Sequence, residues 1–167
     1  MYRLYLKIQL KHPDGTENSC AYCSKEITVT NATNLQRGQH ISLRSQSISG
    51  SDKPYRHHAI IKGTISCSGN NAVHRLIHFD KQDGKIKIYE RIERYDIHIN
   101  EIRIIEYKHP RYSPEEVVRR AEIVLNACGE WKFDSYNPLT CNREHFATWC
   151  VVGKEERFQI QTLRVCI

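Results

Sequence analysis

The chain has 167 residues with a formal net charge of +6, of which 40% are apolar and 26% charged. This is the composition of one ordinary globular domain, and the absence of any run of about 18 apolar residues excludes a membrane-spanning helix. The sequence pI of about 9.0 favours contact with an acidic surface such as anionic lipid or nucleic acid, although a solvated basic surface is the simpler interpretation.

The cysteine content and the N-terminal residues indicate the cellular compartment of the protein. Met1–Lys7 lacks the continuous apolar core of a signal peptide. The seven cysteines are an odd number, at positions 20, 23, 67, 128, 141, 150 and 166. We therefore expect reduced thiols in a cytoplasmic protein that is at most peripheral to membranes.

The sequence of the first two thirds of the chain predicts mainly β-strands. Apolar residues alternate along Met1–Leu10, the period of a half-buried strand, and His12–Gly15 is a turn signal. A serine- and glycine-rich loop is expected over Ser45–Lys53, and a hairpin turn at Asp83–Gly84. Further strands are predicted over Glu26–Thr30, Arg56–Lys62, Val73–Phe79 and Lys85–Ile92, with extended chain continuing from Arg94 to Tyr107.

The last third changes to helical spacing. Ser113 is a good N-cap, followed by Pro114 in the first turn, and Gly129 can end this helix. A second helix is predicted over Asn142–Val152, closed by Gly153, and a final strand over 158–165. Strands followed by helices and one more strand predict an α+β fold with an antiparallel sheet.

Two segments carry residues suited to acyl transfer. Tyr55–Ile61 reads as a strand that bears histidine, and Cys141–Ala147 as the start of a helix beside a cysteine. Thiol chemistry of this type needs a cysteine of lowered pKa, a histidine as base and a polar group that orients the histidine. His40 and His58 are expected to be strand residues with satisfied hydrogen-bond partners.

Four runs resemble the lecithin:retinol acyltransferase (LRAT) family, a branch of the NlpC-type papain-like superfamily that includes small phospholipase A/acyltransferases. They are Leu35–Ile41, Tyr55–Ile60, Leu76–Phe79 and Asn142–Phe146. The resemblance covers residues 35–153, which leaves 1–34 as an N-terminal β extension and 154–167 as a C-terminal strand. It implies a papain-like α+β domain, with an antiparallel sheet packed against two main helices.

The resemblance also assigns roles, with one departure. His57 falls on the family's catalytic histidine and His78 on the second, orienting histidine, so both rings are expected to face the N-terminal end of the 142–152 helix. The nucleophile position falls on Arg143, and Cys141 lies two residues earlier. Either the nucleophile is lost, or Cys141 is a displaced nucleophile. His58 stands where the family usually has an aromatic residue.

The expected function is therefore that of a thiol-dependent acyltransferase or lipid acyl hydrolase, with an acyl lipid or another acyl ester as substrate. The alternative is a catalytically inactive module that binds or regulates. No cofactor or metal is expected, since the Cys20–Cys23 pair has zinc spacing but lacks a second pair. Nucleic acid is the minor alternative, because no aromatic platform accompanies the basic residues. The sequence leaves open the acyl donor, the acceptor, the oligomeric state and whether a membrane anchor belongs to a longer chain.

Overall fold

A computed structural model describes residues 24–45, 55–82, 85–126 and 143–153. The predicted strands over 1–10 and 158–165, the turn at 83–84 and Cys141 lie outside these ranges. Within them the chain forms one antiparallel sheet and two α-helices, so the predicted α+β class is confirmed.

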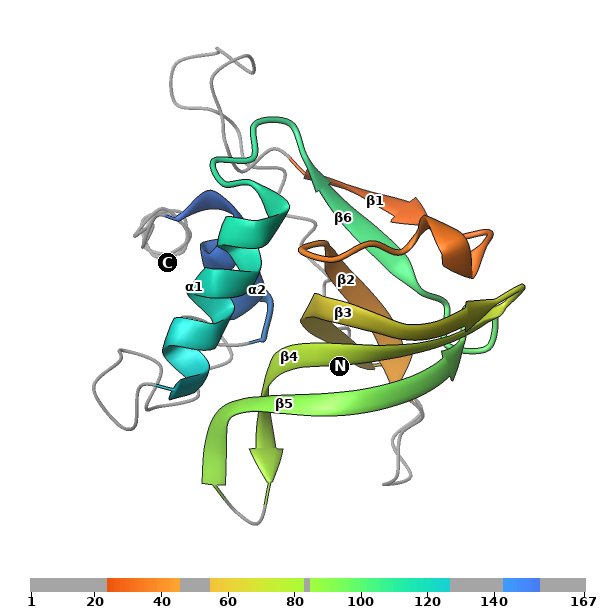
Figure 1. Cartoon of the computed structure of the whole chain (residues 1–167), viewed down its shortest axis with the longest axis horizontal. Helices are drawn as coiled ribbons and strands as arrows, with labels where there is room; N and C mark the ends of the chain where they lie inside the picture. The colour runs from red at the N-terminus through yellow and green to blue at the C-terminus, as the bar shows by residue number, and fades with distance from the viewer. Residues whose placement is uncertain (1–23, 46–54, 83–84, 127–142, 154–167) are drawn as a thin grey trace, which may run out of the picture.

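Six strands form the sheet in the spatial order β1-β6-β2-β3-β4-β5 (Figure 1). Every pair of neighbouring strands is antiparallel. The strands are β1 (Ser24–Thr28), β2 (His40–Ser45), β3 (Tyr55–Ser68), β4 (Asn71–Gln82), β5 (Lys85–Asp96) and β6 (Arg103–Tyr107). A short 3-10 helix, η2 (Ala32–Asn34), lies between β1 and β2. Because β1 pairs with β6, part of the N-terminal extension belongs to the same sheet as the residues that follow it.

The observed strands differ from the prediction in several places: β1 begins and ends two residues earlier, and β2 was not predicted as a strand. Strands β3 and β4 extend beyond the predicted ends as a long hairpin that turns at Gly69, which has a φ of 55°. The extended chain predicted from Arg94 to Tyr107 is wrong in its middle, because a turn separates β5 from β6. The carboxylate of Asp96 accepts the backbone N–H groups of His98 and Ile99, at 2.8 and 3.1 Å, and so closes that turn.

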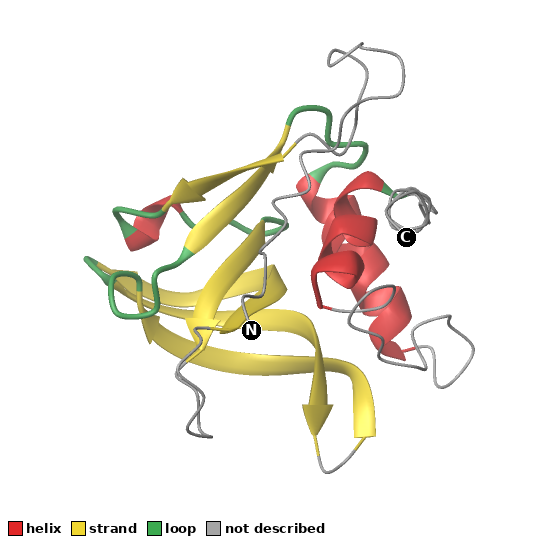
Figure 2. Ribbon diagram, turned by 180° about the vertical axis from the view of Figure 1, so that it is seen from behind, coloured by secondary structure: helices red, strands yellow, loops and turns green. Residues whose placement is uncertain are grey.

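Both predicted helices are present and pack on one side of the sheet (Figure 2). Helix α1 (Pro114–Asn126) is capped as expected, because the Ser113 hydroxyl accepts the N–H of Glu116 at 3.3 Å. Helix α2 (Arg143–Val152) ends at Gly153, whose φ of 77° lets its N–H bond the Trp149 carbonyl at 2.9 Å.

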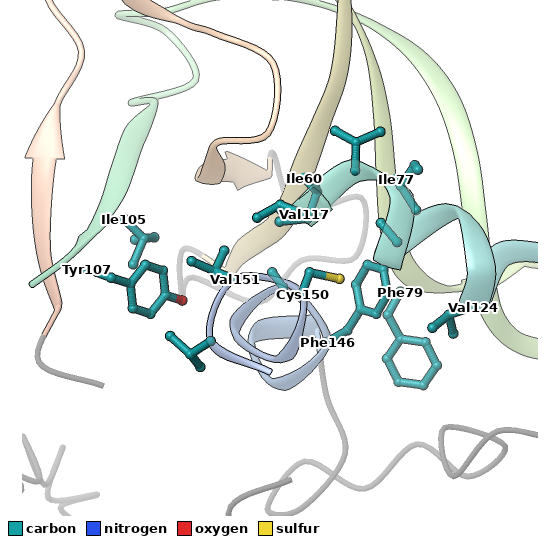
Figure 3. Close-up of a cluster of buried hydrophobic side chains, with 14 residues drawn as sticks. Ile60, Ile77, Phe79, Ile105, Tyr107, Val117, Val124, Phe146, Cys150 and Val151 are labelled. Carbon is teal, nitrogen blue, oxygen red and sulfur yellow. The ribbon is translucent and has the colours of Figure 1, made fainter. Parts of the chain in front are cut away.

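The two faces of the sheet bury different sets of residues. One set joins the sheet to both helices, and Figure 3 shows Ile60, Ile77 and Phe79 of the sheet around Phe146 and Cys150 of α2. The other set contains no residue of α1 or α2 and includes Val29, Ala32, Leu35, Ile41, Ala59, Ile61, Ala72, Leu76, Tyr95, Ile97 and Ile102. We call these the helix face and the opposite face.

Candidate functional site

His57 and His78 lie close together on neighbouring strands. Strand β3 carries His57 and β4 carries His78, and the two ring centroids are 6.3 Å apart in an edge-to-face arrangement. Only 5% of His78 is exposed, whereas His57 is half-buried. The prediction that adjacent strands bring these two histidines together is confirmed.

The direction in which these side chains point differs from the expectation. Residues opposite one another in an antiparallel sheet share a face, and His78 pairs with Ala59 while His57 pairs with Leu43. Ala59 is buried in the opposite face, and Leu43 packs against it. Because successive side chains alternate between the two faces, His57 and His78 lie on the opposite face and not on the face of α2.

His58 is the histidine of this strand that lies on the helix face. It is two residues from Ile60, which packs with α2. Its Nδ1 lies 2.9 Å from Nε2 of His40, which is 2% exposed. The prediction that His40 and His58 are strand residues with satisfied partners is confirmed for this pair.

This pair continues as a line of four hydrogen-bonded side chains, which we call the relay: His58, His40, Tyr107 and Thr148. Nδ1 of His40 lies 2.7 Å from the hydroxyl of Tyr107, and that hydroxyl donates to Oγ1 of Thr148 at 3.0 Å. The relay therefore crosses from β3 through β2 and β6 to α2, and joins the sheet to the helix by polar contacts.

Burial keeps the histidines of the relay neutral. Removal from water lowers the pKa of His40 well below 6.5, and a proton on nearby His58 would lower it further. Burial also lowers the pKa of His58, while the carboxylate of Glu144 in the first turn of α2 acts in the opposite direction. Burial raises the pKa of the Tyr107 hydroxyl, which therefore stays protonated. At neutral pH the relay has neutral rings and a hydroxyl proton to share.

A second buried histidine–tyrosine pair lies elsewhere in the sheet. His74 of β4 is fully buried, and its Nδ1 lies 2.7 Å from the hydroxyl of Tyr95 at the end of β5. Burial lowers the pKa of His74 and raises that of Tyr95. Nε2 of His74 has no hydrogen-bond partner among the described residues. Among the described residues, the hydrogen bonds of this pair therefore do not continue beyond His74.

The start of α2 is the place that the sequence assigned to the nucleophile. The helix begins at Arg143, one residue later than predicted. Cys141 and Asn142 lie outside the described residues, and so does the side chain of Arg143. The distance from the Cys141 thiol to either histidine therefore stays a prediction. Among the described cysteines, Cys150 is fully buried in the helix face and Cys67 is partly exposed on the β3–β4 hairpin.

Two basic side chains of β3 lie beside carboxylates. Lys62 contacts Glu90 at 2.7 Å and Glu122 at 2.9 Å. Arg56 lies 3.8 Å from the carboxylate of Glu101 and donates to its backbone carbonyl at 2.7 Å. The charges of these two cations are thus balanced within the fold.

The described ranges also bear on metal ions and membranes. There, no group of three or more histidine, cysteine or acidic side chains is arranged to hold a metal ion. The Cys20–Cys23 pair falls outside those ranges. Neither α1 nor α2 is long and apolar enough to cross a bilayer.

Sequence reasoning missed the relay. His40 and Tyr107 are separated by 67 residues and meet only because β6 is inserted between β1 and β2. Comparison with known proteins gives no match: no family model fits the sequence, and neither a curated protein nor a solved structure is significantly similar to it.

Proposed function

We propose that this chain is an LRAT-like domain that transfers or hydrolyses acyl groups by thiol chemistry, with an acyl lipid or another acyl ester as substrate. Cys141 is the nucleophile of this proposal, with a histidine of the sheet as its base and a further polar group that orients this histidine. An anionic membrane surface is a fitting partner, because acyl lipids are presented there.

The observation that carries the proposal is the meeting of α2 with a histidine-rich part of the sheet. Four histidines stand on three neighbouring strands, at positions 40, 57, 58 and 78. Helix α2 packs across these strands, and its first turn brings the carboxylate of Glu144 near His58. Cys141 precedes that turn by two residues, where helix N–H groups favour a thiolate.

A second candidate is the same fold without catalysis, as a binding or regulatory module. Two observations favour it. The family's nucleophile position is occupied by Arg143, a cation at the positive end of a helix dipole. In addition, His57 and His78 lie on the sheet face opposite α2. On this interpretation Arg143→Cys restores a reactive thiolate, because Glu144, His145 and Phe146 still follow it.

Hydrolysis of a short-chain phospholipid or thioester separates these candidates. We would compare wild type with Cys141→Ala and Arg143→Cys, and map any covalent acyl label by mass spectrometry. Cys67→Ala is the matched control, since Cys67 is a partly exposed thiol on the β3–β4 hairpin.

Acyl transfer by Cys141 predicts wild-type turnover, a label on Cys141 and a loss of at least about 100-fold in Cys141→Ala but not in Cys67→Ala. An inert wild type together with an active Arg143→Cys variant would instead establish the silent module. Inert but folded forms of both proteins would mean that the site has changed beyond that one residue.

A further inference from the structure

The protons of the relay can be assigned from the hydrogen bond that the Tyr107 hydroxyl donates to Thr148. The Tyr107 hydroxyl donates to Thr148, so its oxygen accepts the Nδ1–H of His40. A neutral imidazole carries one ring proton, so Nε2 of His40 is an acceptor. The ring partner that can donate to it is the Nδ1–H of His58, at 2.9 Å. Nε2 of His58 is therefore left without a proton.

The unprotonated nitrogen belongs to a side chain on the α2 side of the sheet. His58 shares the helix face with Ile60, and Glu144 of the first turn of α2 is the charge that acts most strongly on it. His57 offers no equivalent arrangement on this side, because it lies on the opposite face with Leu43. The pleat of β3 thus presents one oriented histidine to the helix, and this histidine is His58.

We propose that His58, and not His57, is the general base of this site, and that His40, Tyr107 and Thr148 are its positioning residues. The inference rests on the acyl-transfer function proposed above and reassigns the base within it. Nε2 of His58 takes the proton of the attacking thiol or water as sulfur or oxygen bonds the acyl carbon. When the ester C–O bond breaks, the same proton passes from Nε2 to the leaving alcohol oxygen.

The surroundings of His58 suit a base that works near neutral pH. Burial is the largest influence and lowers its pKa, so the neutral form is available to accept a proton. Carboxylates stabilise the imidazolium that forms, and cations oppose it. The charged and titratable neighbours are Glu144 on α2, Glu26 on β1, Arg56 and His57 on β3, and His40 on β2.

The first test compares two adjacent histidines in the full chain with a short-chain ester as substrate. His58→Gln is expected to lower kcat by about 100-fold or more, which is the size of general base catalysis. His57→Gln is expected to keep kcat within about threefold of wild type. Circular dichroism and thermal unfolding would verify that both variants fold.

The positioning role needs a readout that a structural role would not move. His40→Gln is expected to lower kcat and to shift the acidic limb of the pH–rate profile, since an amide that can turn either its oxygen or its nitrogen toward His58 no longer fixes the tautomer of that ring. His74→Gln is the matched control, because it removes another buried histidine bonded to a tyrosine at 2.7 Å. A control that shifted the profile as much as His40→Gln would reject the positioning role.

Nitrogen-15 NMR of the histidine rings tests the tautomer without any turnover. The expected result at neutral pH is a proton on Nδ1 of both His58 and His40. If the rings have this tautomer but the wild-type chain shows no turnover, acyl transfer is rejected, whereas the inferred orientation of His58 stands. A proton on Nε2 of His58, or turnover lost in His57→Gln and kept in His58→Gln, would overturn the reassignment.

Discussion

The two buried histidine–tyrosine pairs are nearly the same unit placed in different surroundings. His40 with Tyr107 and His74 with Tyr95 each join a ring Nδ1 to a hydroxyl at 2.7 Å. The ring centroids are 5.9 and 5.6 Å apart, and both histidines are almost completely buried. The difference lies in what each pair contacts next.

Only the first pair has polar neighbours at both ends. Thr148 accepts from Tyr107, and His58 meets the second nitrogen of His40, whereas His74 has no partner for Nε2 among the described residues. A buried polar group that is paired at every atom holds one geometry, and one that is partly paired serves mainly to fill the core. The comparison therefore separates a relay that can orient a reactive ring from a pair that is part of the packing.

Deleting the two hydroxyl groups gives the largest expected contrast. Tyr107→Phe removes two hydrogen bonds and leaves the buried Nδ1 of His40 and the half-buried hydroxyl of Thr148 without this partner, at an expected cost of about 2 kcal/mol in the free energy of unfolding. Tyr95→Phe removes one bond, and its expected cost is about 1 kcal/mol. Urea unfolding at pH 7 measures both, and equal losses would erase the distinction between the pairs.

The pH dependence of stability gives a smaller contrast. His40 and His74 both have a folded-state pKa below 6.5, so below that pH the unfolded chain binds more protons. Their contribution to stability is present above pH 6.5 and is lost as the pH falls, by up to about 1.4 kcal/mol per pH unit for each ring that stays neutral.

Glutamine variants assign that pH dependence to particular rings. Between pH 6.5 and 5, His40→Gln should flatten the fall in stability more than His74→Gln, because the pKa of His40 is lowered well below its ordinary value. Urea unfolding at several pH values would measure the slopes. An unchanged slope in His40→Gln would show that this ring is protonated in the folded chain.

Local sequence signals accounted for most of the described elements, but not for β2 as a whole or for every connection. The capping serine of α1 and the closing glycine of α2 were visible because each acts within a few residues. The turn between β5 and β6 was missed, because the apolar residues Ile97 and Ile102 continue the appearance of a strand through it. There the side chain of Asp96 decides the structure, through hydrogen bonds that hydrophobic periodicity does not register.

The candidate site was harder to predict, because it depends on register and on distant pairing. The short distance between His57 and His78 could be predicted because the two residues lie on neighbouring strands. The face of the sheet on which their side chains lie could not be predicted as easily, because a shift of a strand by one residue moves every side chain to the other face. The relay depends on β6 pairing with β2, a contact between residues about 60 positions apart that no local pattern specifies.

The smallest expected effect comes from Thr148, the residue of α2 that belongs to the relay. Thr148→Val keeps the shape of the side chain but removes the acceptor of the Tyr107 hydroxyl, and should cost about 1 kcal/mol in the free energy of unfolding. Thr148→Ser keeps an acceptor and is the matched control.

Thr148→Val should also free the Tyr107 proton to turn toward His40, which would move the ring proton of His40 to Nε2 and that of His58 away from Nδ1. Nitrogen-15 NMR of the two rings would detect this change. Unchanged ring tautomers in Thr148→Val would mean that Thr148 anchors the helix without setting the direction of the relay.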